Sequence, residues 1–359
     1  MSDMKLSQPR SARTINTCRV LCALRGTEDL SKAELSRLLE LNKVSTGEIV
    51  NDLISDGLVR ETEKAEVSNG RRPTMLTIVP DSRFALAVDI GRFAISVALC
   101  DLNGNTVKVE RIPTPHKCSV EEFCVSILKS CVRTIKLVES DKILGAGITV
   151  DGVISEDGKT VISSPDLEWK DIPLAQAFEQ ALGCSVVISD RSSALVNAEK
   201  QQDRQISSEK SLMYVDWSNT VSLALVSYGH VFSTSREFGA MQLSEEVTLD
   251  SVCSTSALGA GENVHMRDLW SSVPQSVLNA MSKALRVAYR VTGASRVTIG
   301  GEAATIIEPS LDFIREKCPM LRINRSCLGD RAYVRAAAEL ALDNFFYRFS
   351  MLEDMKDLV

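Results

Sequence analysis

An Asp-Ile-Gly turn at Asp89 and Gly91 is the part of the chain whose residue types best suit phosphate binding. It lies in the stretch Leu86–Gly104, which reads as a buried apolar strand, the turn, a second strand of alternating pattern and a tight hairpin. Glycine in such a turn leaves backbone N–H groups open to an anion, because no Cβ stands in the way. The stretch predicts a phosphate-binding hairpin, although an Asp-x-Gly turn alone has little specificity.

A second hairpin of the same kind follows at Tyr214–Gly229. The residues Ile95–Leu99 align with Val221–Leu225 when one residue of the turn is left out. A hairpin that occurs twice favours an internal duplication. We therefore expect an α/β fold with two lobes and a cleft between them.

Beyond residue 80, strands and helices alternate as such a fold requires. A capping box at Ser119 and Glu122 predicts the start of an amphipathic helix. The remaining pattern predicts helices and strands at Val120–Val138, Ile143–Val150, Pro173–Leu182, Val186–Ile188, Ser193–Glu199, Pro274–Val291, Arg296–Ile299 and Gly329–Phe349.

The first 80 residues have a different pattern, in which three helices precede two short strands. Ser31 and Glu34 form a capping box at the start of the second helix. The other predicted elements are helices at Ser11–Arg25 and Lys43–Ser55, and strands at Leu58–Arg60 and Met75–Val79. This order predicts a winged helix-turn-helix over residues 1–80.

The third helix of this region would be the one that contacts DNA. The spacing of its apolar residues turns Ile49, Val50 and Leu53 inward. The residues that we expect to be free to contact base edges and phosphates are Lys43, Ser45, Thr46 and Asn51. Arg71 and Arg72 in the predicted wing suit a narrow, electronegative minor groove. Acidic residues on or beside the helix oppose binding through phosphate repulsion: Glu48, Asp52 and Asp56.

Composition narrows the class of protein. The chain has 359 residues, of which 44% are hydrophobic and 25% charged, and its net charge of −6 argues against a surface that is basic all over. No apolar run reaches the ~20 residues that span a bilayer, and the first residues have no signal-peptide core. Ten scattered cysteines without a CxxC pair suit a reducing compartment. We expect a cytoplasmic protein with no membrane partner.

The combined pattern resembles the ROK family of sugar-responsive repressors and sugar kinases, over nearly the whole chain. The matching segments are Leu30–Leu35, Gly57–Arg60, Gly70–Pro73, Asp89–Gly91, Gly145–Gly158, Ser164–Leu174 and Gly300–Gly301, of which Ser164–Leu174 is the most specific. Asp151 stands where the family usually has proline. The resemblance implies a winged helix-turn-helix at residues 1–80 and an actin-like, two-lobed domain with a cleft at residues 81–359.

Departures from the family pattern bear on catalysis. The second phosphate turn of family kinases is rich in glycine, whereas residues 218–222 here contain none. Counting back from Glu199 places Asp190 on a family asparagine and Arg191 on the catalytic aspartate, and a cation cannot act as a general base. A slip of one residue would instead place Asp190 on the base. The resemblance then implies an inactive kinase whose first phosphate turn, at Asp89 and Gly91, is vestigial.

The family's zinc site is also degraded. Ala240 stands where the family has a histidine that binds both sugar and zinc, and the cysteine-rich loop is reduced to Cys253. A structural zinc ion needs four ligands, so we expect no metal and no cofactor. Glu237 keeps the family residue that contacts sugar.

We therefore expect a transcriptional regulator that binds an inverted-repeat operator in double-stranded DNA as a homodimer or homotetramer. Asp190, Arg191 and Glu237 would line the cleft if it holds an effector, and Arg191 would favour a sugar acid or another anionic ligand over a neutral sugar. Two alternatives remain open: a sugar kinase with a rebuilt site, and a non-catalytic scaffold that dimerises.

Overall fold

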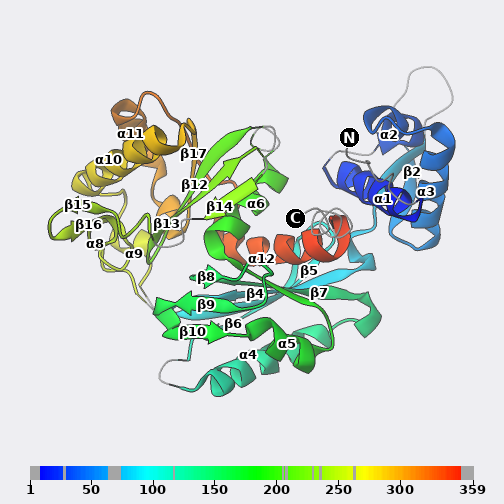
Figure 1. Cartoon of the computed structure of the whole chain (residues 1–359), viewed down its shortest axis with the longest axis horizontal. Coiled ribbons are helices and arrows are strands. Elements are labelled where there is room, and N and C mark those ends of the chain that lie inside the picture. Colours follow the sequence, from blue (N-terminus) through cyan, green and yellow to red (C-terminus); the bar gives the residue numbers. More distant parts are fainter. Residues whose placement is uncertain are drawn as a thin grey trace, which may run out of the picture.

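The computed structural model describes residues 9–26, 30–63, 74–115, 118–203, 206, 209–228, 230–233, 237–261 and 264–348. The N-terminal part, here called the head, is the blue region of Figure 1. It contains α1 (Pro9–Gly26), β1 (Leu30–Ser31), α2 (Lys32–Leu38), α3 (Lys43–Ser55), β2 (Val59–Glu63) and β3 (Thr74–Ile78), with the strands in the order β1-β3-β2.

Local hydrogen bonds explain why the helices of the head begin where they do. The capping box predicted at Ser31 and Glu34 is present: the Ser31 hydroxyl accepts from the Glu34 amide, and the Glu34 carboxylate accepts from the Ser31 amide. The Asn42 side chain caps α3 by accepting from the Ser45 amide at 2.7 Å. Three helices and a small sheet in this order form a winged helix-turn-helix, as predicted.

The rest of the chain forms two lobes around two five-stranded sheets. The first sheet has the order β11-β7-β4-β5-β6 and consists of β4 (Phe84–Ile90), β5 (Ala94–Asp101), β6 (Thr106–Pro113), β7 (Ile143–Val150) and β11 (Val186–Asp190). The second has the order β14-β13-β12-β17-β18 and consists of β12 (Ser211–Trp217), β13 (Val221–Ser227), β14 (His230–Ser233), β17 (Arg296–Gly300) and β18 (Arg322–Arg325).

The two sheets share one topology, which confirms the predicted duplication. In each, three antiparallel strands are followed by two parallel ones. The register is equivalent as well: Asp89 lies opposite Ser96 in the first hairpin, and Asp216 lies opposite Ser222 in the second. The two aspartates therefore occupy matching positions, one in each lobe.

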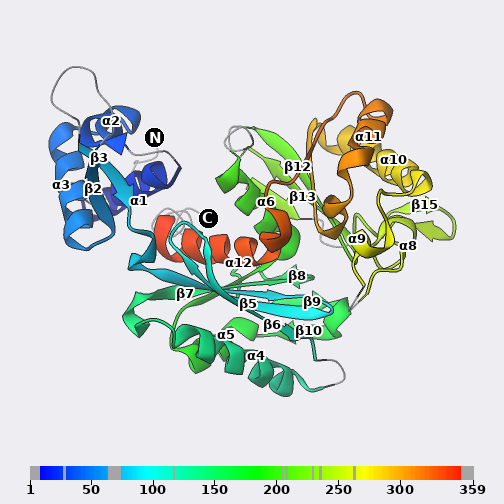
Figure 2. The same ribbon diagram turned by 180° about the vertical axis from the view of Figure 1, so that it is seen from behind.

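Helices cover both faces of the first sheet. On its outer face lie α4 (Val120–Ile135) and α5 (Leu174–Leu182), and on its inner face lies α12 (Ala332–Leu342), shown in red in Figures 1 and 2. The second lobe contains α8 (Leu249–Cys253), α9 (Met266–Leu269), α10 (Gln275–Thr292) and α11 (Leu311–Lys317). Small strands complete the lobes: β8 (Val153–Ile154), β9 (Val161–Ser164), β10 (Trp169–Ile172), β15 (Gln242–Ser244) and β16 (Val247–Thr248).

The helix α12 lies close to the first sheet and joins the two lobes. A Cβ at Gly147 of β7 would lie only 2.1 Å from the carbonyl oxygen of Ala337, so glycine is required for this approach. On its other side α12 packs with α6 (Arg191–Gln202) against the second sheet. The single closing helix predicted for Gly329–Phe349 is instead three segments: the 3-10 turn η6 (Gly329–Arg331), α12, and the π-helical turn η7 (Asp343–Tyr347).

The head and the lobes share one hydrophobic cluster. Leu21 and Leu24 of α1 belong to it together with Leu342 of α12 and with Phe346 and Tyr347 of η7. The head is therefore packed directly on the two-lobed part.

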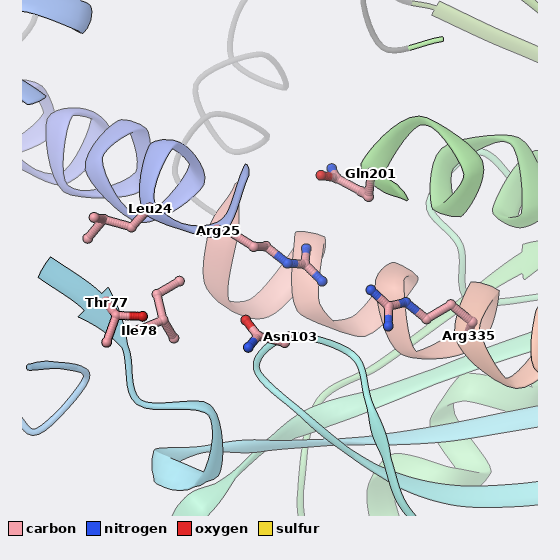
Figure 3. A pocket seen from close by; sticks show the side chains of 7 residues that line it. All are labelled: Leu24, Arg25, Thr77, Ile78, Asn103, Gln201 and Arg335. Atoms are coloured by element: carbon pink, nitrogen blue, oxygen red, sulfur yellow. The ribbon is translucent and has the colours of Figure 1, made fainter. Parts of the chain in front are cut away.

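Ion pairs reinforce this junction. Arg25 of α1 donates to Glu339 of α12 at 2.6 Å, and its guanidinium lies 4.2 Å from the ring centre of Tyr347. The side chains of Arg25 and Glu339 are only 8% and 1% exposed. A polar cavity of about 190 Å³ lies beside the pair, and it is lined by Arg25 of α1, Gln201 of α6, Arg335 of α12 and Asn103 of the turn between β5 and β6 (Figure 3).

The buried pair predicts a measurable contribution to stability. Arg25→Met should lower the free energy of unfolding by about 3 kcal/mol, because it leaves buried carboxylates with one cation fewer. Arg133→Met is the matched control, since Arg133 is 60% exposed and pairs with the partly exposed Glu110, and it should cost no more than about 1 kcal/mol. Urea unfolding measures both, and equal effects would contradict a structural role for the junction pair.

Candidate functional site

A buried ion pair lies at the centre of the cleft. Asp89, at the end of β4, accepts two hydrogen bonds from the Arg191 guanidinium, from Nε and from Nη2, each at 2.8 Å. It also accepts one from the Thr149 hydroxyl at 2.9 Å. Burial opposes the charge of Arg191, but the Asp89 carboxylate more than offsets this, and the pKa of Arg191 is raised. Arg191 is therefore a permanent cation held by both of its partner's oxygens.

The guanidinium fills the open side of the first phosphate turn. A Cβ built on Gly91 would lie 2.7 Å from Nη2 of Arg191 and 2.6 Å from the carbonyl oxygen of Ala94. The glycine thus makes room for an internal cation. The prediction that Arg191 binds an anionic ligand has to be corrected, because the edge of the guanidinium that would hold an anion already holds Asp89.

Asp216 occupies the equivalent position in the second lobe, at the end of β12. It accepts hydrogen bonds from the Ser218 hydroxyl at 2.9 Å and from the Tyr333 hydroxyl at 2.8 Å. The ring of Tyr333 lies under Arg191, with 4.4 Å between the guanidinium carbon and the ring centre. A continuous chain of contacts, Asp89–Arg191–Tyr333–Asp216, therefore connects the two sheets.

The environment of Asp216 shifts its ionisation. Burial raises the pKa of Asp216 to about 6, and Arg191 with the hydroxyl groups of Tyr333 and Ser218 opposes the shift.

The side chains of the second turn are engaged by the protein itself. Ser218 accepts from the Glu302 amide at 3.1 Å, while the Asn219 side chain accepts from Thr255 at 3.3 Å. The Thr220 hydroxyl donates to Asp151 of the first lobe at 2.9 Å. Asp151 is the residue that departs from the family pattern, and it contributes a second link between the lobes.

A cavity of about 430 Å³ opens beside these contacts. Asp89, Gly91 and Arg191 line it, as the sequence predicted, but Asp190 and Glu237 are not among its lining residues. Asp190 caps α6, where it accepts from the Ser193 amide at 3.0 Å and from the Ser192 hydroxyl at 2.8 Å. Glu237 is exposed in the turn after β14. Of the three residues predicted to line the cleft, only Arg191 does so.

On the head, the structure places three of the six predicted DNA-binding residues on the solvent side of α3. Lys43 and Asn51 are exposed and Ser45 is half-buried. Thr46 is wrongly predicted: it is 0% exposed, and its hydroxyl donates to the Asn42 carbonyl at 3.0 Å. The physical reason is helical phase, because position 46 shares the inner face with positions 49, 50 and 53. Arg71 and Arg72 lie outside the described residues.

Two features of α3 escaped the sequence reasoning. Val44 is 72% exposed, and an apolar side chain on such a helix suits the methyl group of thymine. Glu48 and Asp52, expected to repel phosphate, both pair with Arg13 of α1, Asp52 at 2.6 Å and Glu48 at 3.6 Å. Spacing within α3 could have indicated Val44, whereas the contribution of Arg13 depends on how α1 packs.

A zinc site is not formed by the predicted remnants. Cys253 is buried in the core of the second lobe, its thiol lies 3.7 Å from the Val277 carbonyl oxygen, and burial raises its pKa to about 12. Within the described ranges, no group of three or more His, Cys, Asp and Glu side chains could hold a metal ion. In the same ranges, no helix is both long and apolar enough to cross a membrane.

Comparison with known proteins agrees with this architecture. Residues 85–256 match the sequence model of the ROK family. The chain contains a ROK family domain. A putative xylose repressor from Caldicellulosiruptor sp. (strain Rt8B.4) is 26% identical over 257 residues, which are 70% of this chain and 63% of that protein. The chain therefore spans less than two thirds of that relative's length.

Solved structures resemble both the ROK domain and the head. A ROK family transcriptional regulator, a homologue of the Escherichia coli Mlc protein, superposes with a TM-score of 0.73 at 19% identity, over 96% of this chain and all of that one. A ROK family glucokinase from Streptomyces griseus, solved with glucose and AMPPNP, gives a TM-score of 0.61 at 16% identity, over 72% of this chain and 98% of that one. At these identities the likeness shows the fold.

The pKa of Asp216 predicts a pH-dependent stability. A carboxyl group whose pKa rises on folding from 3.8 to about 6 stabilises the fold fully below about pH 4, and this contribution is lost as the pH rises through about 6. Asp216→Asn keeps an acceptor for Tyr333 and Ser218 but carries no charge. Its stability relative to the wild type should therefore improve by up to about 3 kcal/mol between about pH 4 and pH 7. Urea unfolding across this range tests it, and a constant difference would contradict it.

Gly47 predicts a stability effect within α3. A Cβ at Gly47 would meet nothing within 4 Å, so Gly47→Ala should raise the free energy of unfolding by about 0.5–1 kcal/mol through helix propensity. Gly57→Ala is the control, because Gly57 also has open space but a φ of +69°, and this variant should be destabilised. Thermal unfolding compares the two, and a destabilised Gly47→Ala would contradict the open position.

Proposed function

We propose that this chain is a DNA-binding transcriptional regulator whose ROK domain does not transfer phosphate. The observation that carries the proposal is the position of the Arg191 guanidinium, which is ion-paired with Asp89 and lies next to Gly91 of the first phosphate turn. A phosphate and a permanently seated guanidinium cannot occupy the same space. The relatives named as repressors agree with a regulatory role.

DNA binding rests on the exposed face of α3. Asn51 and Lys43 flank Val44 and Gly47 on this face, where an amide can read adenine, an ammonium can contact phosphate and a valine can contact a thymine methyl group. Asn51 already accepts from Lys32 at 2.9 Å, which orients its side chain. Arg13 neutralises the acidic pair on the same helix and so reduces its repulsion of the DNA backbone.

The wing and the oligomer complete this proposal. Arg71 and Arg72 would reach the adjacent minor groove. One head presents few cations, so useful affinity requires two heads on one molecule, where the second contact becomes intramolecular. We therefore propose a dimer on an inverted repeat, with half-sites one or two turns of about 10 base pairs apart.

The helix α12 offers a route from the cleft to the head. Tyr333 at its start contacts Arg191 and Asp216, and Glu339 near its end pairs with Arg25 of α1. Any ligand that changes the spacing of the lobes would move a helix that is rigidly packed against the head. The name of the xylose repressors favours a sugar-related effector for the cleft.

DNA selection from genomic fragments tests the regulator proposal. The full-length chain should enrich discrete fragments at moderate salt, and Asn51→Ala should relax the base preference and weaken binding by about tenfold. Lys170→Ala is the charge control, since Lys170 is exposed on β10, away from the head, and it should bind as the wild type does. Absence of any preferred fragment would contradict the regulator and favour the non-catalytic scaffold.

An assay for phosphate transfer tests the rest of the proposal. With MgATP and a panel of hexoses, pentoses and amino sugars, the wild type should show no turnover above background. Turnover that Asp190→Ala abolishes would contradict the proposal and support a sugar kinase with a rebuilt site.

A further inference from the structure

Three exposed arginines that line the cavity do not belong to the central network. Arg111 of β6, Arg267 of α9 and Arg331 of η6 all line the 430 Å³ cavity. In the part of the chain that the structure describes, none of the three forms an ion pair with a carboxylate. They come from both lobes and from the connection before α12, so they converge only because of the fold.

The carboxylates that line the same cavity do not balance these arginines. Asp89 is neutralised by Arg191, and Glu302 accepts from the Met266 amide at 3.0 Å and lies 3.4 Å from Nδ1 of His265. Asp330 is the third carboxylate that lines the cavity. Because the whole chain carries a net charge of −6, the cationic character of the cavity is a local property.

The N-terminus of α12 adds a second, independent attraction for anions. Its first residues, Ala332 to Val334, line the cavity. No side chain caps this helix, and no acidic residue lies in its first turn. The helix dipole at such an end favours a negative charge.

We propose that this cavity binds a compact polyanion, a small molecule with at least two negative oxygen groups such as phosphates or carboxylates. This rests on the proposed function, because the ligand would be the regulator's effector. It differs from the ligand predicted from Arg191: that side chain is sealed by Asp89, and the anion is held by Arg111, Arg267 and Arg331.

The same geometry disfavours a nucleoside triphosphate. Tyr333 and Arg191 contact each other where the two turns meet, and Arg111, Arg267 and Arg331 line the same cavity. A ligand that bridges Arg267 of the second lobe and Arg111 of the first would draw the lobes together. The ligand would draw the lobes together at the start of α12, whereas the Arg25–Glu339 pair lies near the other end of that helix.

Calorimetric titration of the full-length protein tests the site without DNA. The probes are pyrophosphate, citrate and 6-phosphogluconate as polyanions, glucose and xylose as neutral sugars, and MgATP. Polyanions should bind at submillimolar concentration and neutral sugars should not. Arg111→Gln, Arg267→Gln and Arg331→Gln should each weaken polyanion binding by about tenfold. Arg322→Gln, an exposed arginine outside the cavity, should not.

The outcomes separate this proposal from the regulator itself. Any one of three results would overturn the anion site. The first is a wild type that binds none of the polyanions, the second is binding by all three variants that equals that of the wild type, and the third is tighter binding of MgATP than of pyrophosphate. The three exposed arginines can be replaced without disturbing the core, so the variants should keep the wild-type unfolding temperature and DNA affinity. If the variants lose polyanion binding but still bind DNA, the regulator proposal is unaffected. If the wild type binds no DNA, the regulator proposal itself is contradicted.

Discussion

The ion pair between Asp89 and Arg191 is the interaction on which the rest of the cleft depends. Asp89 is buried and the Arg191 side chain is only 12% exposed, so removing either would leave an uncompensated, largely desolvated charge. The pair fixes the start of α6 to the end of β4, and the fixed guanidinium provides the surface on which Tyr333 lies. Tyr333 in turn holds Asp216 of the other lobe. A cation supplied by the chain itself thus connects two carboxylates that a duplicated fold places face to face.

The helix α12 carries the consequences of this arrangement to the head. It can lie against the first sheet only because β7 has glycine at position 147. Its two ends perform different tasks: Tyr333 belongs to the cleft, and Glu339 belongs to the junction with α1. The head shares its hydrophobic cluster with Phe346 and Tyr347, so it packs directly on the segment that follows α12. Packing and ion pairs therefore form a continuous connection between the cleft and the head.

Features that depend on residues close together in the chain could be predicted from the sequence, whereas contacts between distant segments could not. The capping box at Ser31, the repeated hairpin and the alternation of strands and helices depend on neighbouring residues, and all appear in the structure. Thr46 was misplaced although it lies three, four and seven residues before Ile49, Val50 and Leu53, because the prediction relied on the polarity of its side chain. Arg191 was expected in the cleft, but its partner lies 102 residues away in the chain, so its ion pair could not be read from spacing. Tyr333 carried no signal at all, because its role exists only where both lobes meet.

In the second turn, hydrogen bonds within the protein take the place of those that a bound phosphate would form. A glycine-rich turn leaves N–H groups that a bound phosphate satisfies. Here the side chains of Ser218, Asn219 and Thr220 form hydrogen bonds within the protein, to Asp216, to Thr255 and across the cleft to Asp151. The first turn is occupied in the same sense by Arg191. Both turns are thus satisfied by side chains of the protein itself, and the same side chains make the contacts between the lobes.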